Sequence, residues 1–330
     1  VNNMIIRTPS RLHMSLFDMN GSYKRIDGGI GLALQDPQFV LECEETEKGV
    51  TFDFDSKLSD EEAIAECSEK IPAAAKRTIE HFSIDTGFHF TVHSTYHPHS
   101  GLGSGTQIAL ATAKLITESV GISGVEGKEL STIVGRGGTS GIGTYVNELG
   151  GLIVDGGHSL VEKPGFLPSG ASKASPPPLI ARYEFPEEWD ILVAMPDIDY
   201  YVNGQQEVNI FQTYCPIPKD EVEKVSHIVL MNLLPFLLEK DIKNVGWSVS
   251  QLQKYGFNNL EHSLEPHILP TMKAIEEAGA YGVGISSFGP AVYTFFDEEN
   301  KHIVDATKEI VGEDNVFVTK AQNHGYVLEK

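Results

Sequence analysis

Residues 97–107 read His97-Pro98-His99-Ser100-Gly101-Leu102-Gly103-Ser104-Gly105-Thr106-Gln107, and an apolar helical pattern follows at once over residues 108–116. Three glycines within five residues allow the main chain to come close to an oxygen-rich ligand. The N-terminus of the following helix adds partial positive charge and free backbone amides, which together favour anions. The stretch therefore predicts a phosphate site, although it matches neither the Walker pattern nor the dinucleotide pattern.

A second glycine cluster occupies residues 135–143 and reads Gly135-Arg136-Gly137-Gly138-Thr139-Ser140-Gly141-Ile142-Gly143. Two such clusters in one domain indicate two loops that converge on one ligand. We therefore expect the ligand to contact Gly137 and Gly138 of the second cluster. In the first loop, the residues expected to bind substrate or phosphate are His99, Ser100, Gly101, Leu102, Gly103, Ser104, Gly105, Thr106 and Gln107.

The length and charge of the chain restrict its class. At 330 residues the chain suits two domains. It carries 46 acidic and 25 basic residues, a formal charge of −21, which argues against nucleic acid or an anionic membrane as a partner. We find no apolar run long enough to cross a bilayer and no signal-peptide pattern, so we expect a soluble cytoplasmic protein. The cysteines Cys43, Cys67 and Cys215 form no CxxC pair and predict reduced thiols.

The order of expected elements divides the chain at residue 187. Residues 1–187 form the phosphate-loop domain, with a mostly β beginning and a helix over residues 60–82 capped by Asp60. Residues 163–178 are rich in Pro, Ser and Gly and predict an exposed loop that is a candidate lid. Residues 188–330 follow the order strand, helix, two strands, helix, strand, which is typical of a ferredoxin-like α+β layer. In that domain we expect helices near 219–240, 265–279 and 300–311.

Three segments resemble the superfamily of galactokinase, homoserine kinase, mevalonate kinase and phosphomevalonate kinase. They are the strand region 11–18, the loop 101–104 and the turn 284–290. The resemblance implies an α+β, two-domain kinase-like fold with an N-terminal ribosomal protein S5 domain 2-like layer and a C-terminal ferredoxin-like layer. Kinases of the superfamily usually carry a general-base aspartate where this chain has Gly143, and a glycine supplies no base.

Read together, the two glycine clusters, residues 11–18 and residues 28–31 resemble the archaeal β-ribofuranosylaminobenzene 5′-phosphate synthase family, a branch of the superfamily that is not a kinase. The resemblance implies a pentosyltransferase of methanopterin biosynthesis. Such an enzyme joins the ribose of phosphoribosyl pyrophosphate to the ring of 4-aminobenzoate or 4-hydroxybenzoate and releases CO₂ and pyrophosphate. It also implies a homodimer. The sequence leaves the choice between the two acceptors open.

This chemistry needs electrostatic stabilisation of both the departing pyrophosphate and the cationic ribose. We expect Mg²⁺ to assist the glycine loop, with Arg11 or Arg136 binding a phosphate group bidentately. Asp18 is a further catalytic candidate because its carboxylate suits either Mg²⁺ or the cationic sugar. The candidate metal ligands are Asp18, Asp27 and Ser104, and the candidates for closing the cleft from the second domain are Ser286 and Ser287.

Two other functions fit the same residues. The first is an ATP-dependent kinase of the same superfamily acting on a small alcohol. The second is a binding protein without catalysis that retains the loop. The presence of both the glycine loop and the neighbouring arginines favours the synthase over the binding protein.

Overall fold

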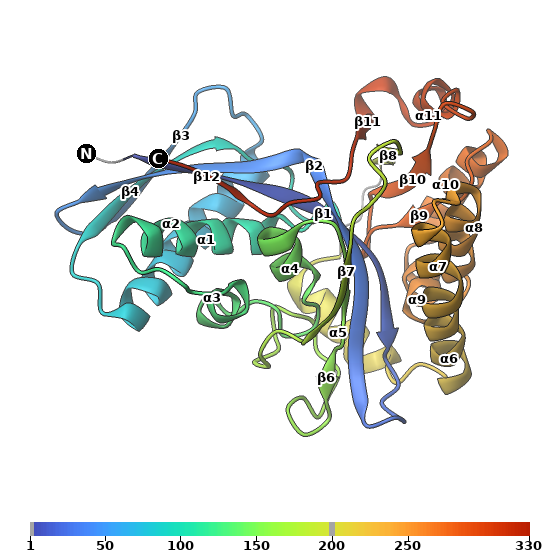
Figure 1. Ribbon diagram of the computed structural model, residues 1–330, viewed down its shortest axis with the longest axis horizontal. Helices are drawn as coiled ribbons and strands as arrows, with labels where there is room; N and C mark the ends of the chain where they lie inside the picture. Colours follow the sequence, from blue (N-terminus) through green and yellow to red (C-terminus); the bar gives the residue numbers. More distant parts are fainter. Residues whose placement is uncertain (1–2, 198–201) are drawn as a thin grey trace.

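A computed structural model of the protein describes residues 3–197 and 202–330. Two β-sheets with their own helices lie side by side, the first on the left of Figure 1 and the second on the right. The expected α+β class is confirmed.

The first sheet has eight strands and is built on one long antiparallel pair. Six further strands complete it. Three of them, β12, β4 and β3, extend the order to β12-β1-β2-β4-β3, while β5 and β6 pair with β2 and β7 pairs with β5. All its neighbours are antiparallel except β3 and β4, which are joined by the crossover helix α1. The strands are β1 (Met4–Asp18), β2 (Arg25–Thr46), β3 (Val50–Phe54), β4 (Gly87–Ser94), β5 (Leu152–Asp155), β6 (His158–Ser159), β7 (Leu179–Tyr183) and β12 (Val327–Glu329).

β1 and β2 are longer than the sequence pattern predicts. Two short strands are expected in each place, but each pair is one continuous strand, with β1 passing through register shifts after Pro9 and His13. One part of β2 pairs with β4 and another with β5, so this strand connects two parts of the sheet. Because β1 and β2 are so long, residues 11–16 of β1 extend beyond the centre of the first sheet and reach the second layer.

Three helices, α1, α2 and α4, cover one face of the first sheet, and α3 packs against them from outside (Figure 1). α1 begins as expected, because Asp60 accepts a hydrogen bond from the Ala63 amide at 3.0 Å. Its buried face includes Cys67 and Ile71, as the helical spacing predicts. α2 begins directly after Gly103, so the expected loop-to-helix junction is confirmed. The helices are α1 (Glu61–Phe82), α2 (Ser104–Ser119), α3 (Gly127–Val134) and α4 (Ile142–Leu149).

The second sheet has the strand order β11-β8-β10-β9 and is antiparallel throughout. Its chain order is strand, helices, two strands, helix, strand, which confirms the predicted ferredoxin-like layer. The strands are β8 (Asp190–Ala194), β9 (Gly284–Ile285), β10 (Val292–Phe296) and β11 (Val316–Thr319). The last strand, β12, returns to the first sheet and pairs with β1, although it falls within the predicted second domain.

The helices of the second layer are more numerous than expected. The predicted helix near 219–240 is interrupted by a π-helical segment, and the structure adds α5, α8 and α9, which the sequence analysis missed. The helical segments are α5 (Gly204–Tyr214), α6 (Lys219–Ile228), η1 (Val229–Leu233), α7 (Leu234–Leu238), α8 (Ile242–Leu252), α9 (Gly256–Leu264), η2 (Pro266–Ile268), α10 (Leu269–Glu277), α11 (Ile303–Val311) and η3 (Glu313–Asn315). Two of the missed helices, α5 and α9, contribute to the site described below.

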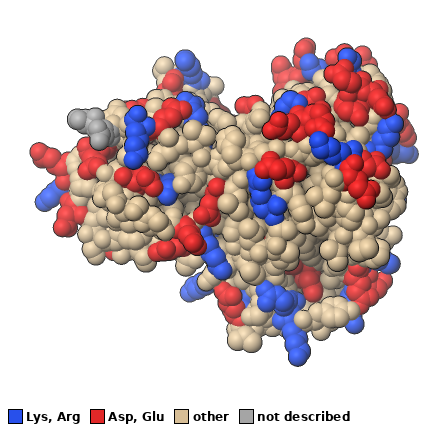
Figure 2. All heavy atoms as spheres, in the orientation of Figure 1, with Lys and Arg blue, Asp and Glu red and all other residues tan. Residues whose placement is uncertain are grey.

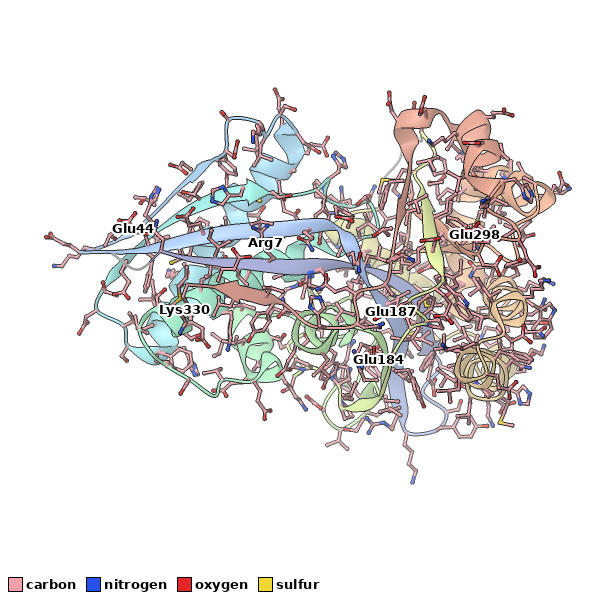
Figure 3. The ribbon with its side chains drawn as sticks, turned by 45° about the horizontal axis from the view of Figure 1, so that its top comes forward. Arg7, Glu44, Glu184, Glu187, Glu298 and Lys330 are labelled. Carbon is pink, nitrogen blue, oxygen red and sulfur yellow. The ribbon has the colours of Figure 1, made fainter. Side chains whose placement is uncertain are left out.

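One hydrophobic core runs through both layers, from Met4 in β1 to Phe295 in β10. Outside this core, acidic side chains are spread over both lobes among fewer basic ones (Figure 2). Figure 3 places Glu44 and Glu184 on the first layer and Glu298 on the second. In the described ranges, no helix has the length and apolar character of a membrane span. All three cysteines are free thiols, as expected.

The first testable consequence concerns Gly31 in β2. A Cβ atom there would overlap the Ile142 side chain of α4 and the Leu12 carbonyl oxygen of β1. We expect Gly31→Ala to lower the free energy of unfolding by about 1–3 kcal/mol, the usual cost of overpacking a core. Urea unfolding measures this change. Gly165→Ala is the matched control, because its Cβ would meet no atom within 4 Å, and an equal loss in both variants would contradict the close approach.

Candidate active site

A cavity of about 620 Å³ lies between the two layers. The first layer contributes β1, one face of α1 and both glycine clusters to its wall. α5, α9 and the turn after β9 supply the opposite part of the wall. The site-residue predictions that line it are Arg11, His99, Gly101, Gly103, Ser104, Gly105, Thr106, Arg136 and Ser287.

The first glycine loop has the left-handed backbone that its glycines permit, with φ of 94° at Gly101 and 78° at Gly103. The Gly101 carbonyl accepts hydrogen bonds from Arg11 Nη1 at 2.7 Å and from Ser286 Oγ at 2.6 Å. The Arg11 amide donates to the Leu102 carbonyl at 3.0 Å. These bonds engage the loop carbonyls and leave the amides at the start of α2 beside the cavity.

Some residues expected to bind the ligand instead hold the loop together. The Ser100 hydroxyl donates to the His97 carbonyl at 2.9 Å, and Leu102 is buried in the core. Gln107 is fully buried and donates to the Gly143 carbonyl at 2.9 Å. Ser286 accepts a hydrogen bond from the His13 amide at 3.0 Å while donating to the loop. The structure places none of these four in the cavity wall.

Arg11 and His13 project from β1 into the site. Burial lowers the pKa of Arg11 to about 10, so its guanidinium stays charged at neutral pH. Burial, together with the Arg11 charge, lowers the pKa of His13 to about 3, so this imidazole is neutral. Its Nε2 atom lies 3.1 Å from Ser140 Oγ of the second cluster. Arg11 is therefore a fixed cation for an anionic ligand, and His13 acts as a neutral hydrogen-bonding group.

Arg136 reaches the first loop from the second cluster. Its Nε donates to Thr106 Oγ1 at 3.0 Å, so the two clusters do converge as predicted. A Cβ atom on Gly143 would lie only 2.9 Å from Thr106 Cγ2, so an aspartate would not fit here without movement of Thr106. The Thr106 side chain therefore closes the position where the kinases of the superfamily usually carry their base, beside the partly buried Arg136.

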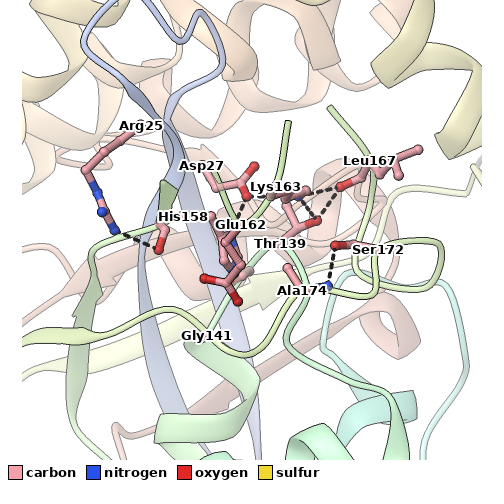
Figure 4. A network of polar contacts seen from close by, with 12 residues as sticks. Arg25, Asp27, Thr139, Gly141, His158, Glu162, Lys163, Leu167, Ser172 and Ala174 are labelled. Atoms are coloured by element: carbon pink, nitrogen blue, oxygen red, sulfur yellow. Dashed lines mark hydrogen bonds and ion pairs between the residues drawn. The ribbon is translucent and has the colours of Figure 1, made fainter. Parts of the chain in front are cut away.

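The two aspartates predicted to hold metal have other contacts. Asp18 accepts hydrogen bonds from the Asn20 and Gly21 amides at 3.0 and 2.9 Å and so caps a turn. Asp27 is buried and pairs with Lys163 Nζ at 2.8 Å and His158 Nδ1 at 2.6 Å (Figure 4). The structure brings neither carboxylate into the cavity wall, so the roles predicted for Asp18 and Asp27 are not supported by their position.

Lys163 also ties the segment 163–178 to the second glycine cluster. Its ammonium group donates to Thr139 Oγ1 and to the Leu167 carbonyl, each at 2.8 Å (Figure 4). Gly137 and Gly138 lie against Pro176 and Ser172 of this segment and not against the cavity. The segment is partly buried, in contrast to the exposed loop that was predicted, and only Ser169 and Gly170 of it reach the cavity.

Several acidic and aromatic residues of the cavity were missed by the sequence analysis. Three of them, Glu62, Glu66 and Glu69, lie on one face of α1 at the spacing i, i+4 and i+7. The spacing alone predicts that the three carboxyls share one face of the helix. Only the structure shows that this face lies beside the first glycine loop. Ser104 Oγ donates to Glu66 Oε2 at 2.7 Å. The remaining missed residues, among them Glu207 and Glu261, come from α5, α9 and the turn after β9.

Comparison with known proteins identifies the family. The GHMP kinases N terminal domain matches residues 69–150. The β-ribofuranosylphenol 5′-phosphate synthase of Methanothermobacter thermautotrophicus is 49% identical, and the alignment covers 100% of both chains. The chain belongs to the β-ribofuranosylphenol 5′-phosphate synthase family. The synthase of Archaeoglobus fulgidus is 38% identical over 98% of this chain and 99% of its own.

Membership in this synthase family confirms the predicted relationship and the predicted enzyme class. Membership does not favour either alternative function, the ATP-dependent kinase or the binding protein without catalysis. The crystal structure of homoserine kinase from Cytophaga hutchinsonii superposes with a TM-score of 0.66 at 18% identity, covering 100% of this chain and 98% of that one. The predicted kinase-like fold is therefore confirmed. The chain shares this fold with homoserine kinase but belongs to the synthase family.

The buried ion pair at Asp27 gives a testable prediction for this site. Lys163→Met would leave the Asp27 carboxylate buried without its ammonium partner, and we expect a loss of about 3–5 kcal/mol in unfolding free energy. Chemical denaturation measures the loss. Lys173 lies on the same segment and is exposed, so Lys173→Met should change the unfolding free energy little. Adding Asp27→Asn to the Lys163→Met variant should restore part of the loss; no recovery would contradict the ion-pair explanation.

Proposed function

We propose that this enzyme joins the ribose of phosphoribosyl pyrophosphate to 4-hydroxybenzoate, at the ring carbon that bears the carboxylate, and releases CO₂ and pyrophosphate. One observation carries the proposal. A single cavity combines an anion-binding loop and two partly buried arginines with a wall of phenylalanines. The relatives' name specifies a phenol, which favours 4-hydroxybenzoate over 4-aminobenzoate as the acceptor. The resemblance assigns the step to methanopterin biosynthesis.

The pyrophosphate of the donor fits the side of the cavity formed by the first glycine loop. The amides at the start of α2 favour an anion there through hydrogen bonds and the helix dipole. Arg11 and Arg136 supply fixed positive charge that becomes more favourable as charge builds up on the departing oxygens. The closed position at Gly143 agrees with this chemistry, because pyrophosphate departure needs no base at an alcohol.

The ribose becomes cationic as pyrophosphate leaves, and Glu207 of α5 is suited to face it. This carboxyl lines the cavity and feels the charges of both Arg136 and Arg11. Burial outweighs these two attractions and raises its pKa. Glu207 is thus a carboxyl that lies close to the arginine side of the cavity without forming an ion pair with either arginine within the described residues.

Mg²⁺ is the cofactor that we propose, and the residues fit it. Ser104 and Glu66 present adjacent oxygen atoms to the cavity beside the glycine loop. Mg²⁺ is commonly bound by one or two carboxylates together with substrate phosphates, so a larger cluster of ligands is not required. When bound, Mg²⁺ would neutralise charge on the leaving pyrophosphate. Ser104 was predicted for this role, and Glu66 takes the place of Asp18 and Asp27 in the proposal.

The homodimer remains a prediction from the resemblance, and the cytoplasmic location remains a prediction from the sequence pattern. The use of 4-aminobenzoate as a second acceptor also remains a prediction, because an amino group activates the same ring carbon.

The activity is tested by incubating the purified protein with Mg²⁺, phosphoribosyl pyrophosphate and carboxyl-labelled 4-hydroxybenzoate. We expect CO₂ and pyrophosphate to appear in equal amounts. A parallel reaction with ATP and small alcohols, without the phosphoribosyl donor, should consume no ATP. Folded protein that releases neither product would overturn the proposed synthase activity, and ATP consumption would revive the kinase.

The proposed metal ligand gives a separate prediction. Glu66→Gln removes the charge beside Ser104, so we expect the Mg²⁺ concentration for half-maximal activity to rise at least about tenfold, since hard cations prefer charged oxygen ligands. A Mg²⁺ titration of the initial rate measures this. Glu80→Gln, farther along α1 and outside the cavity wall, is the control. An unchanged Mg²⁺ requirement in Glu66→Gln would remove Glu66 from the site.

A further inference from the structure

The cavity has an aromatic wall that the glycine loops do not contribute. Phe211 of α5, Phe257 of α9 and Phe288 of the turn after β9 meet there. The ring centroids of Phe211 and Phe257 are 5.1 Å apart, and those of Phe257 and Phe288 are 5.7 Å apart. Leu16 of β1 packs into the same cluster. Edge-to-face and tilted rings of this kind leave faces and edges that accept another flat ring.

One carboxyl group interrupts this aromatic wall. Glu261 lies one helical turn after Phe257 on α9, so both side chains project from the same face of the helix. The residue is only 5% exposed, yet it lines the cavity. Within residues 3–197 and 202–330, its side chain forms no hydrogen bond or ion pair. Its carboxyl is therefore open to the cavity, where a ligand with a hydrogen-bond donor would supply the missing partner.

The groups around Glu261 do not compensate its charge. Burial, together with the like charge of Glu207, which lines the same cavity from α5, raises the pKa of Glu261 well above its usual range and makes its carboxylate a stronger base than a free glutamate. On the core side lies Tyr293 of β10, whose hydroxyl is buried without a partner. Glu207 is close to Arg11 and Arg136 as well. The order from the phosphate loop is thus arginines, Glu207 and Glu261.

This order matches the order of groups in the proposed reaction. Pyrophosphate would lie at the arginines, the cationic ribose beside Glu207, and the flat acceptor along the phenylalanine wall. The acceptor's reacting carbon must face the ribose, so its para substituent points the opposite way. Glu261 is the polar group at that position among the phenylalanines.

We propose that Glu261 binds the para substituent of the aromatic acceptor and takes its proton while the ring attacks the ribose. This inference rests on the proposed function and assigns a specificity-determining and catalytic residue to it. A carboxylate accepts a hydrogen bond from a para hydroxyl or a para amino group alike. It rejects a para methoxy group, which has no proton to donate and leaves the buried carboxylate unpaired.

The proton and electrons balance without any further reactant. The hydroxyl O–H bond breaks and its proton moves to Glu261, while the oxygen electrons push through the ring. The ring carbon bearing the carboxylate bonds to the anomeric carbon, whose bond to pyrophosphate breaks with the electron pair leaving on pyrophosphate. The bond from the ring to the carboxylate then breaks, CO₂ departs, its electron pair restores the aromatic ring, and Glu261 returns the proton to the para oxygen.

The test compares Glu261→Gln and Glu261→Leu with the wild type, after wild-type release of CO₂ from 4-hydroxybenzoate has been established. Failure of the wild type at that first step would overturn the proposed function itself. Glu261→Gln still accepts a hydrogen bond but takes no proton. We expect its kcat to fall by about 10²–10⁴, the usual contribution of a general base. The KM for phosphoribosyl pyrophosphate should stay within about threefold, because the phosphate contacts are untouched.

Calorimetric binding provides the readout that does not depend on turnover. In the presence of Mg²⁺ and pyrophosphate, the wild type should bind 4-hydroxybenzoate at least about tenfold more tightly than 4-methoxybenzoate, the difference expected for an unpaired buried group. Glu261→Gln should retain this preference and Glu261→Leu should lose it. Glu277→Gln, on the exposed side of α10, is the control. Wild-type turnover together with an unchanged preference in Glu261→Leu, or wild-type kcat in Glu261→Gln, would overturn the assignment.

Discussion

The glycine loop between β4 and α2 is the constraint on which the site depends. Its backbone has a left-handed conformation at Gly101 and Gly103, and its carbonyls accept hydrogen bonds from two other segments, β1 and the turn between β9 and β10. Arg11 of β1 holds it from one side, while Ser286 holds it from the second layer. The Ala291 amide adds a hydrogen bond to the Ser100 carbonyl at 3.1 Å. The loop is therefore also the joint between the two layers, because its carbonyls bond both to β1 and to the turn between β9 and β10.

This joint explains why amides and not carbonyls face the cavity. A loop whose carbonyls are already bonded presents mainly donors, and the first turn of α2 adds more. Arg11 serves the loop twice, since its amide and its guanidinium each bond to it. The remaining charge of the guanidinium is directed at the cavity in a site where burial strengthens electrostatic effects. In this acidic protein, two of the few cations are thus placed at the cavity, where the proposed pyrophosphate would lie.

The fold of the kinases has been adapted at one position. At Gly143 the side chain is absent, and Thr106 and Arg136 fill the region where those enzymes usually carry a carboxylate base. A carboxylate there would oppose a leaving pyrophosphate, whereas an arginine attracts it. The carboxyl groups of this cavity lie elsewhere, on α1, α5 and α9. Their positions suit a metal, a cationic sugar and a ring substituent in turn.

The sequence by itself determined the loop-to-helix junction, the α1 boundaries, the ferredoxin-like order of the second layer and the location of Arg11 and Arg136 beside the glycine loops. These features rest on local signals: glycine spacing, the Asp60 cap and hydrophobic periodicity, which short-range sterics and hydrogen bonds enforce. Only the tertiary structure decided that Asp27 belongs to a buried ion pair with Lys163, and that Gln107 supports the loop from behind. Glu66, Glu207 and Glu261 reach one cavity from helices far apart in the chain. Their meeting depends on how two layers pack against each other, and the free energy of that packing is not encoded in any single local pattern.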